Sequence, residues 1–267
     1  MPALRDWLQQ AQDLEPIERE LLASDVLQLS RAQILVDSNR SISQQQLNQL
    51  QDFTARLRNG EPYAYLTGRQ EFWSLDFQVS PAVLIPRPET ELLVELVVAR
   101  APSHARILDL GTGSGAIAIS IAHQRPDLNV TACDISVDAL QVAQLNNKTH
   151  NTDVQFIQSD WFSQLSGQWD IIVSNPPYIA QDDPHLPQLQ AEPSLALIAG
   201  DGLDAIRTII AKANNFLSRQ GQLLLEHGFD QANDVQHLFA QHGYLNCTSH
   251  KDLAGILRVT AATRDDS

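Results

Sequence analysis

The sequence has 267 residues, of which 43% are hydrophobic, enough for one large domain with a sizeable core and a smaller domain beside it. Acidic residues outnumber Lys and Arg by 32 to 18, and the formal net charge of −14 argues against binding to DNA or RNA, which depends on neutralisation of phosphates by basic side chains. Two cysteines are too few for a disulfide framework or a zinc site, and no signal-peptide core or transmembrane-length apolar run is present, so we expect a globular cytoplasmic protein.

The first 60 residues predict a small helical-bundle domain. Apolar side chains recur at helical spacing, as in Leu4, Trp7, Leu8 and Ala11, and polar breaks separate the helical segments. No catalytic motif lies in residues 1–60. Because the fold that follows does not need an appended bundle, we interpret this domain as a partner-recognition module.

Residues 61–87 predict a β-hairpin linker, because apolar and polar residues alternate in the segment 72–79. The linker leads into the run Ile85-Pro86-Arg87-Pro88-Glu89-Thr90-Glu91, where a proline suits the first turn of a helix and the acidic residues suit its positive end. This run is typical of a helix start and equally of a segment that lines a site. The sequence leaves open whether Arg87 or Glu89 lines one.

From residue 88 to residue 267 predicted strands alternate with predicted helices. Apolar runs predict five strands, at 106–110, 130–134, 154–157, 170–174 and 222–226. Helices are predicted at 114–124, around 140–145, at 203–217 and at 230–241. Two last segments, 244–249 and 255–261, are typical of an antiparallel strand pair. The pattern predicts a doubly wound, seven-stranded, mostly parallel α/β domain of the Rossmann-like kind with right-handed crossovers.

A glycine-rich loop joins the first of these strands to its helix. Its sequence is Asp109-Leu110-Gly111-Thr112-Gly113-Ser114-Gly115, and its glycines let the backbone turn sharply and approach a ligand closely. Asp134 ends the second strand, where it is placed to accept hydrogen bonds from both hydroxyls of a ribose. Together they predict a site for a cofactor that contains a nucleoside, with the segment from Gly111 to Gly115 and Asp134 as contacts.

The loop alone does not identify the cofactor. Gly111, Gly113 and Ala116 also fit the dinucleotide pattern, which keeps a nicotinamide cofactor as an alternative. S-adenosylmethionine fits better, because the chain has no second nucleotide-binding half and supplies no acid or base for hydride transfer. Trp161, after the third strand, is a candidate to pack on the adenine, although a core aromatic is an equal interpretation.

The stretch Asn175-Pro176-Pro177-Tyr178 follows the fourth strand, at the end where open α/β sheets bind ligands. The prolines keep it extended. A planar NH2 group could donate one hydrogen to the Asn175 side-chain oxygen and the other to the Pro176 carbonyl, with Tyr178 against its flat face. Since no side chain here is a nucleophile, we expect a site that holds a substrate nitrogen.

Together these residues resemble the protein-glutamine N5-methyltransferases, most closely the family that methylates peptide chain release factors. The resemblance covers nearly the whole chain and also includes Tyr65-Leu66-Thr67-Gly68, the run that ends at Glu91, and Ser159-Asp160-Trp161-Phe162. The Ile-Pro-Arg-Pro-Glu-Thr-Glu run is the more specific mark, because adenine-N6 methyltransferases share the Asn-Pro-Pro-Tyr stretch. One mild departure is Ala199-Gly200, where the family usually has Gly-Gly.

The resemblance implies a class I methyltransferase domain over residues 88–267 that uses S-adenosylmethionine. It implies that the glycine loop, Asp134, Trp161 and Asn175 bind this cofactor, and that residues 175–178 hold the glutamine of the Gly-Gly-Gln tripeptide in class 1 release factors. We expect direct in-line methyl transfer, with Asn175, Pro176 and Tyr178 at the reacting nitrogen. We also expect no metal, no membrane or direct nucleic-acid partner, and a monomer when the protein is free.

Three other functions remain open at this stage. A ribosomal-protein glutamine methyltransferase or a nucleic-acid adenine-N6 methyltransferase would use the same stretch on the same kind of NH2 group, although the net charge argues against the second. A NAD-dependent oxidoreductase is more remote.

Overall fold

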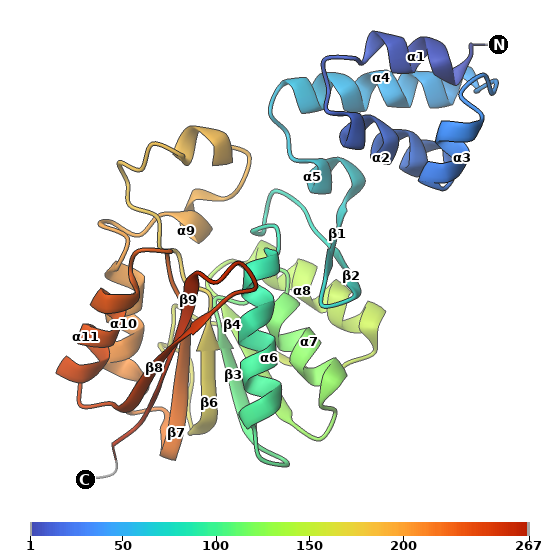
Figure 1. The fold of residues 1–267 in the computed structure, drawn as a ribbon. Helices are drawn as coiled ribbons and strands as arrows, with labels where there is room; N and C mark the ends of the chain where they lie inside the picture. The colour runs from blue at the N-terminus through green and yellow to red at the C-terminus, as the bar shows by residue number, and fades with distance from the viewer. Residues whose placement is uncertain (1, 266–267) are drawn as a thin grey trace. The chain divides into compact units, whose positions relative to one another are not determined.

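The computed structural model describes residues 2–265, and the chain divides into two compact units, Met1–Gly68 and Arg69–Ser267 (Figure 1). Each unit has a hydrophobic core of its own. The division falls at Gly68, eight residues beyond the predicted end of the bundle.

The first unit is a bundle of helices, as the apolar spacing predicted. Its helices are α1 (Leu4–Gln10), α2 (Pro16–Leu27), α3 (Arg31–Val36), α4 (Gln44–Arg58) and α5 (Tyr63–Thr67). Ser30 and Ser43 are the N-cap residues of α3 and α4, and each side chain accepts a hydrogen bond from the backbone N–H three residues on. Trp7 is buried in the core, where its Nε1 donates to the Thr54 hydroxyl at 3.2 Å.

The predicted hairpin is formed by β1 (Arg69–Phe72) and β2 (Leu75–Gln78), and it belongs to the second unit. One buried amide fastens it there. Asn146 of α8 (Val137–His150) accepts from the Gln78 backbone N–H at 2.7 Å and donates to the Gln78 carbonyl at 3.0 Å and to the Ser114 carbonyl at 2.9 Å. The hairpin is therefore packed onto the α/β domain and continuous with its core.

The second unit is built on a seven-stranded sheet, in agreement with the predicted fold class. Its strands, in spatial order, are β5 (Gln155–Gln158), β4 (Asn129–Asp134), β3 (Arg106–Leu110), β6 (Trp169–Ser174), β7 (Leu217–Glu226), β9 (Leu257–Thr263) and β8 (Leu245–Lys251). The five strands from β5 to β7 are parallel, whereas β9 runs antiparallel to both of its neighbours.

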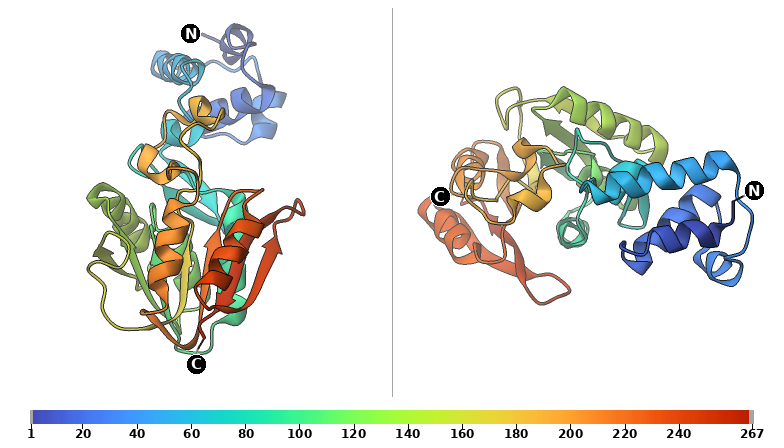
Figure 2. Two further views of the ribbon diagram at one scale, coloured as in Figure 1. Left: turned by 90° about the vertical axis from the view of Figure 1, so that its left-hand side faces the viewer. Right: turned by 90° about the horizontal axis from the view of Figure 1, so that it is seen from above.

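Helices cover both faces of this sheet (Figures 1 and 2). The helices that contribute to the two faces include α6 (Glu91–Arg100) and α7 (Ala116–Gln124) for one face, and α10 (Asp204–Ala213) and α11 (Ala232–Gln241) for the other. Neighbouring residues of β6 alternate between the two cores: Ile171 and Val173 pack with the first, and Ile172 packs with the second. This explains why Ile171, Ile172 and Val173 are apolar in succession.

Several predicted boundaries differ from the structure by one or two residues, and two differ by more. The helix expected at 203–217 ends at Ala213, because the chain turns there and the Phe216 carbonyl instead accepts a hydrogen bond from the Trp169 backbone N–H at 2.8 Å. Accordingly β7 begins at Leu217, before the predicted 222. The remaining polypeptide includes three short helical segments: η1 (Pro88–Thr90), η2 (Leu186–Leu189) and α9 (Ser194–Leu197).

The strand order reverses between β3 and β6. From β3 the chain proceeds outward through β4 to β5, and then returns to place β6 on the other side of β3. The loops after β3 and β6 therefore leave the sheet side by side and diverge, which opens a crevice at the carboxyl ends of the strands.

Candidate active site

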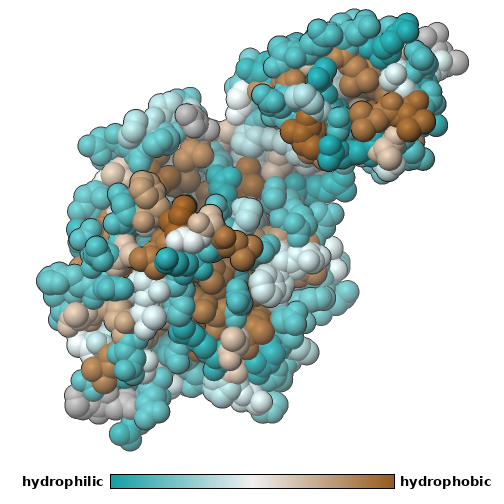
Figure 3. All heavy atoms as spheres, viewed as in Figure 1, coloured by the Kyte–Doolittle hydropathy of each residue, from teal (hydrophilic) through white to brown (hydrophobic). Residues whose placement is uncertain are grey.

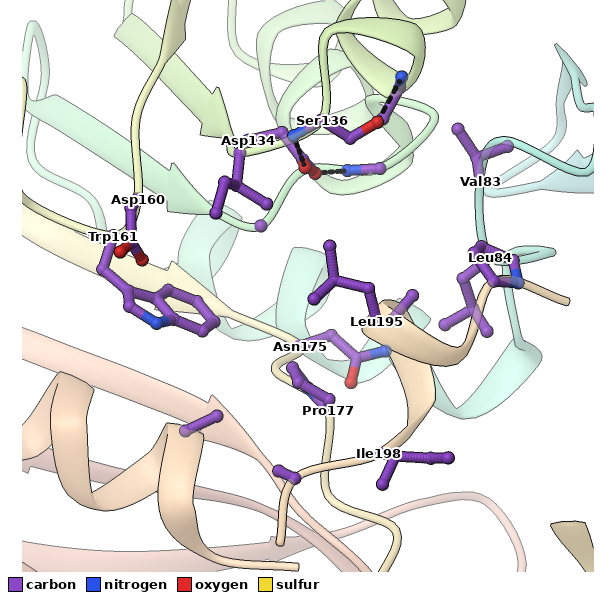
Figure 4. Close-up of a pocket in the computed structure, with 18 of the residues that line it drawn as sticks. Val83, Leu84, Asp134, Ser136, Asp160, Trp161, Asn175, Pro177, Leu195 and Ile198 are labelled. Carbon is purple, nitrogen blue, oxygen red and sulfur yellow. Dashed lines mark hydrogen bonds between the residues drawn. The ribbon is translucent and has the colours of Figure 1, made fainter. Parts of the chain in front are cut away.

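A pocket of about 380 Å³ occupies this crevice, and Figure 4 shows it. Six of the predicted site residues line it: Gly111, Gly113, Asp134, Trp161, Asn175 and Pro177. Gly111 and Pro177, which lie 66 residues apart in the sequence, thus line the same cavity.

The glycine loop is folded by its own side chains and backbone. The Thr112 hydroxyl donates to Asp109 at 2.6 Å, and the backbone N–H groups of Gly111 and Thr112 both donate to the Cys133 carbonyl at 2.9 Å. Burial raises the pKa of Asp109 to about 7. Gly111, Gly113 and Gly115 all have positive φ.

Three residues of this loop do not line the pocket. Thr112 and Ser114 are buried, and the Ser114 carbonyl accepts from Asn146. Gly115 begins α7, where an added Cβ would lie 2.7 Å from Ile119 Cδ1. These three shape the loop, while Gly111 and Gly113 form the pocket wall.

Asp134 is held by backbone groups at the end of β4. Its Oδ2 accepts from the Gly113 N–H and its Oδ1 from the Ser136 N–H, both at 2.9 Å (Figure 4). Burial raises the pKa of Asp134, and these N–H groups counteract that effect by favouring the charged form. Each carboxylate oxygen keeps a further lone pair, so the side chain can still accept from a diol.

Trp161 lies on the pocket wall and also packs against the core. Its backbone has φ +48, and its ring lies so close to the glycine loop that a Cβ on Gly111 would be 3.6 Å from Trp161 Cζ3. Trp161 therefore lines the pocket on one side and packs against the core on the other, and its contact with an adenine stays a prediction.

A second pocket, also of about 380 Å³, adjoins the first, and Leu84, Asn175 and Ala196 line both. Pro176 and Tyr178 line this second pocket only, so the Asn-Pro-Pro-Tyr stretch is divided between the two. Arg87 and Glu89 line the second pocket, which answers the question that the sequence left open.

Three groups outside the predicted set support the second pocket. Glu192 is buried, forms an ion pair with Arg87 and accepts from the Ile85 N–H at 3.1 Å. Glu226 is buried at the end of β7 and accepts from the Tyr178 hydroxyl at 3.2 Å. Thr90 is buried and accepts from the Asn175 amide, Nδ2 to Oγ1, at 3.1 Å.

Sequence reasoning missed these three and Arg258, which lines the second pocket. One signal was available for Glu226, because a carboxylate that directly follows three leucines ends a buried strand on the ligand-binding edge of the sheet. Thr90 lies in the run from Ile85 to Glu91, which the sequence left open as a segment that lines a site, but nothing in that run singled it out.

Within residues 2–265, no cluster of three or more His, Cys, Asp or Glu side chains is arranged to hold a metal ion. The search over the same residues finds no helix with the length and hydropathy needed to span a membrane.

The residues present fit a cofactor with an adenosine and a short charged chain. Gly111 and Gly113 leave the wall open to close approach, Asp134 presents carboxylate oxygens, and Trp161 presents an aromatic ring. The far end of the pocket reaches Asn175, at the boundary with the second pocket.

Comparisons with known proteins agree with this architecture. A family model described as methyltransferase small domain matches residues 88–191, and one described as PrmC N-terminal domain matches residues 3–68. The release factor glutamine methyltransferase of Coxiella burnetii is 44% identical over 253 residues, which is 93% of this chain and 91% of that protein.

The release factor glutamine methyltransferase of Escherichia coli is 45% identical over 266 residues, 96% of each chain. Among solved structures, a methyltransferase from Pyrococcus furiosus has a TM-score of 0.57 at 18% identity and covers 80% of this chain and 98% of its own, which is a likeness of fold.

Proposed function

Because this chain belongs to the release factor glutamine methyltransferase family, we propose that it methylates the side-chain nitrogen (N5) of the glutamine in the Gly-Gly-Gln tripeptide of class 1 release factors. The methyl donor is S-adenosylmethionine, which fits the first pocket. The observation that carries the proposal is that the two pockets share Leu84, Asn175 and Ala196, of which Asn175 alone has a polar side chain.

The roles of the two pockets follow from their linings. The first has the glycine wall, Asp134 and Trp161, and would hold the nucleoside of the donor. The second has Pro176 and Tyr178, and would hold the glutamine side chain. When bound, the cofactor supplies an electrophilic methyl group. Asn175 lies where donor and acceptor meet.

The side chains at this boundary address one chemical problem. An amide nitrogen is a poor nucleophile, because its lone pair is delocalised into the carbonyl group. Asn175 Nδ2 is engaged with Thr90, which leaves the Asn175 Oδ1 to accept one hydrogen of the substrate NH2. The Pro176 carbonyl accepts the other. These two acceptors orient the lone pair and stabilise the positive charge that develops on the nitrogen.

No strong base is needed before the methyl group moves. The nitrogen becomes acidic only once it carries the new methyl group, and the proton then leaves to solvent. Tyr178 packs against the flat face of the amide, and its hydroxyl is held by Glu226. Burial and the nearby Glu226 raise the pKa of Tyr178, so the phenol stays neutral.

The helical unit is proposed to contribute to recognition of the release factor. Apolar side chains reach its surface, among them Ile17, Leu35 and Val36, and Figure 3 shows apolar atoms on this unit. The net charge of −14 supports the absence of direct nucleic-acid binding. That the free protein is a monomer stays a prediction, to be measured by analytical ultracentrifugation.

The deciding experiment is transfer of a labelled methyl group from S-adenosylmethionine to a purified class 1 release factor. A second release factor, with the Gly-Gly-Gln glutamine replaced by alanine, is the matched control. We expect label on the first protein alone. Equal label on both would place the acceptor elsewhere, and label on neither, with the cofactor still bound, would reject release factors as the substrate.

A further inference from the structure

Two buried side chains hold the two ends of the Asn-Pro-Pro-Tyr stretch. Asn175 Nδ2 donates to the Thr90 hydroxyl at 3.1 Å, and the Tyr178 hydroxyl donates to Glu226 Oε1 at 3.2 Å. The Thr90 hydroxyl also lowers the pKa of Glu226. Thr90 therefore holds Asn175, and Glu226 holds Tyr178.

The direction of these hydrogen bonds determines which end of the Asn175 amide faces the substrate. The Thr90 oxygen is the acceptor, and of the two ends of an amide only the NH2 group can donate to it. The Asn175 Oδ1 then points away from Thr90.

The opposite orientation would be unproductive. A half-turn of the Asn175 amide would present its NH2 group to the substrate nitrogen, which also carries two hydrogens and has a delocalised lone pair. Two donors would then face each other at the reacting atom. A free asparagine side chain has little preference between these orientations, so a neighbour has to select one.

We propose that Thr90 and Glu226 are positioning residues, which orient the Asn175 amide with its oxygen toward the substrate glutamine and hold Tyr178 beside it. This inference rests on the proposed function. It also gives a role to the Pro-Glu-Thr-Glu part of the run that the sequence analysis left without one, because Thr90 ends η1 there and is buried.

Glu226 is an unusual choice for a purely structural residue. It is 1% exposed, its Oε2 has no hydrogen-bond partner within residues 2–265, and burial raises its pKa to about 7. The other groups that act on it are Arg258, which lowers its pKa, and Glu89, which raises it. Such a buried carboxyl costs stability, whereas an apolar side chain of similar length would not.

The first test compares Thr90→Val with Thr90→Ser, measuring kcat, the KM for the release factor and the Kd for S-adenosylmethionine. Valine keeps the shape and loses the hydroxyl, while serine keeps the hydroxyl. We expect Thr90→Val to lower kcat about tenfold or more, the scale of ~1.4 kcal/mol, with KM and Kd changed less than about threefold, and Thr90→Ser to retain most of the activity.

The control is Thr54→Val in the helical unit. Thr54 is also buried, and its hydroxyl also accepts from one N–H group. It donates in turn to the Leu50 carbonyl at 2.6 Å. We expect this variant to lose stability and keep kcat at saturating release factor. A matching drop in kcat there would show that loss of any buried hydroxyl suffices, and would overturn the inference.

Glu226→Met is the second variant, and it decides the question if Thr90→Val does not fold. We expect kcat to fall as in Thr90→Val while the melting temperature stays equal or rises, a combination that a merely structural residue would not give. The inference is overturned if either variant keeps kcat within about threefold of the wild type, or if its loss appears in KM or Kd alone. If the wild-type protein itself leaves the release factor unlabelled, the proposed function fails first, and the inference fails with it.

Discussion

Replacing Gly115 with alanine tests how tightly the glycine loop is packed against α7 and α8. Gly115 has φ +83, a conformation that costs an L-residue about 1 kcal/mol. An added Cβ would lie 2.7 Å from Ile119 Cδ1 and 3.2 Å from Ala143 Cβ. Ile119 can turn its terminal methyl away, whereas the Ala143 methyl is fixed to the backbone and cannot rotate away. Such overpacking costs about 1–3 kcal/mol.

The two effects add to about 3 kcal/mol of lost stability in the second unit. For a domain of this size, 1 kcal/mol corresponds to about 2–4 °C, so Gly115→Ala should lower the melting temperature of that unit by about 6–12 °C. Differential scanning calorimetry is the suitable assay, because the two units can unfold in separate transitions.

Gly113→Ala is the matched control, in the same loop. Its φ is +55, but nothing lies within 4 Å of an added Cβ, so backbone strain alone remains and we expect a loss of about 2–4 °C. Both variants are measured without cofactor, since Gly113 lines the pocket. Equal losses in the two variants would refute the argument that contact with Ala143 decides the cost.

Three further predictions concern the site. Asn175→Ala should lower kcat by about 10²–10³-fold, because it removes an acceptor that stabilises the charge on the substrate nitrogen. The melting temperature should stay nearly unchanged, because only a single half-buried hydrogen bond is lost. Near-normal turnover would contradict the role of Asn175. Trp161→Ala should weaken S-adenosylmethionine binding by roughly tenfold in titration calorimetry without changing the KM for the release factor. A change in KM alone would show that the ring contacts the substrate and not the cofactor. Burial raises the pKa of Asp109 and Glu226 from 3.8 and 4.5 to about 7, so between these values the folded protein keeps two protons that the unfolded chain releases; the free energy of unfolding should therefore fall by about 1.4 kcal/mol per group and pH unit as the pH rises toward 7. In urea unfolding, the difference in this free energy between pH 5 and pH 7 should be smaller for Glu226→Met than for the wild type. An unchanged difference would contradict the burial effect.

Much of the fold followed from local sequence. The strand that begins at Arg106 and ends at Leu110 was predicted to the residue, because a short segment rich in branched apolar residues leads directly into the glycine loop, which ends it. The helix predicted from Ser114 begins two residues later, since Gly115 is still in the left-handed region. Boundaries were least accurate at Ala213 and Leu217, where a turn and a strand pairing replaced a longer helix.

The candidate site followed from sequence only in part. Gly111, Asp134 and Asn175 each end or follow a strand, and parallel strands bring their carboxyl ends to one edge, so their convergence was predictable. The position of the hairpin was not predictable, because it depends on contacts between residues far apart in the sequence, such as Asn146 and Gln78, which are 68 residues apart.

The sequence by itself determined which functional groups are available to the site. These are glycines that allow close approach, a carboxylate at a strand end, and an asparagine amide in a stretch that two prolines keep extended. These are properties of single residues and short stretches, and they do not depend on distant contacts. Only the tertiary structure decided how that amide is oriented. Thr90 and Glu226 act on Asn175 and Tyr178 across separations of 85 and 48 residues, and hydrogen bonds of this kind depend on how η1, β6 and β7 pack together, which no local pattern encodes.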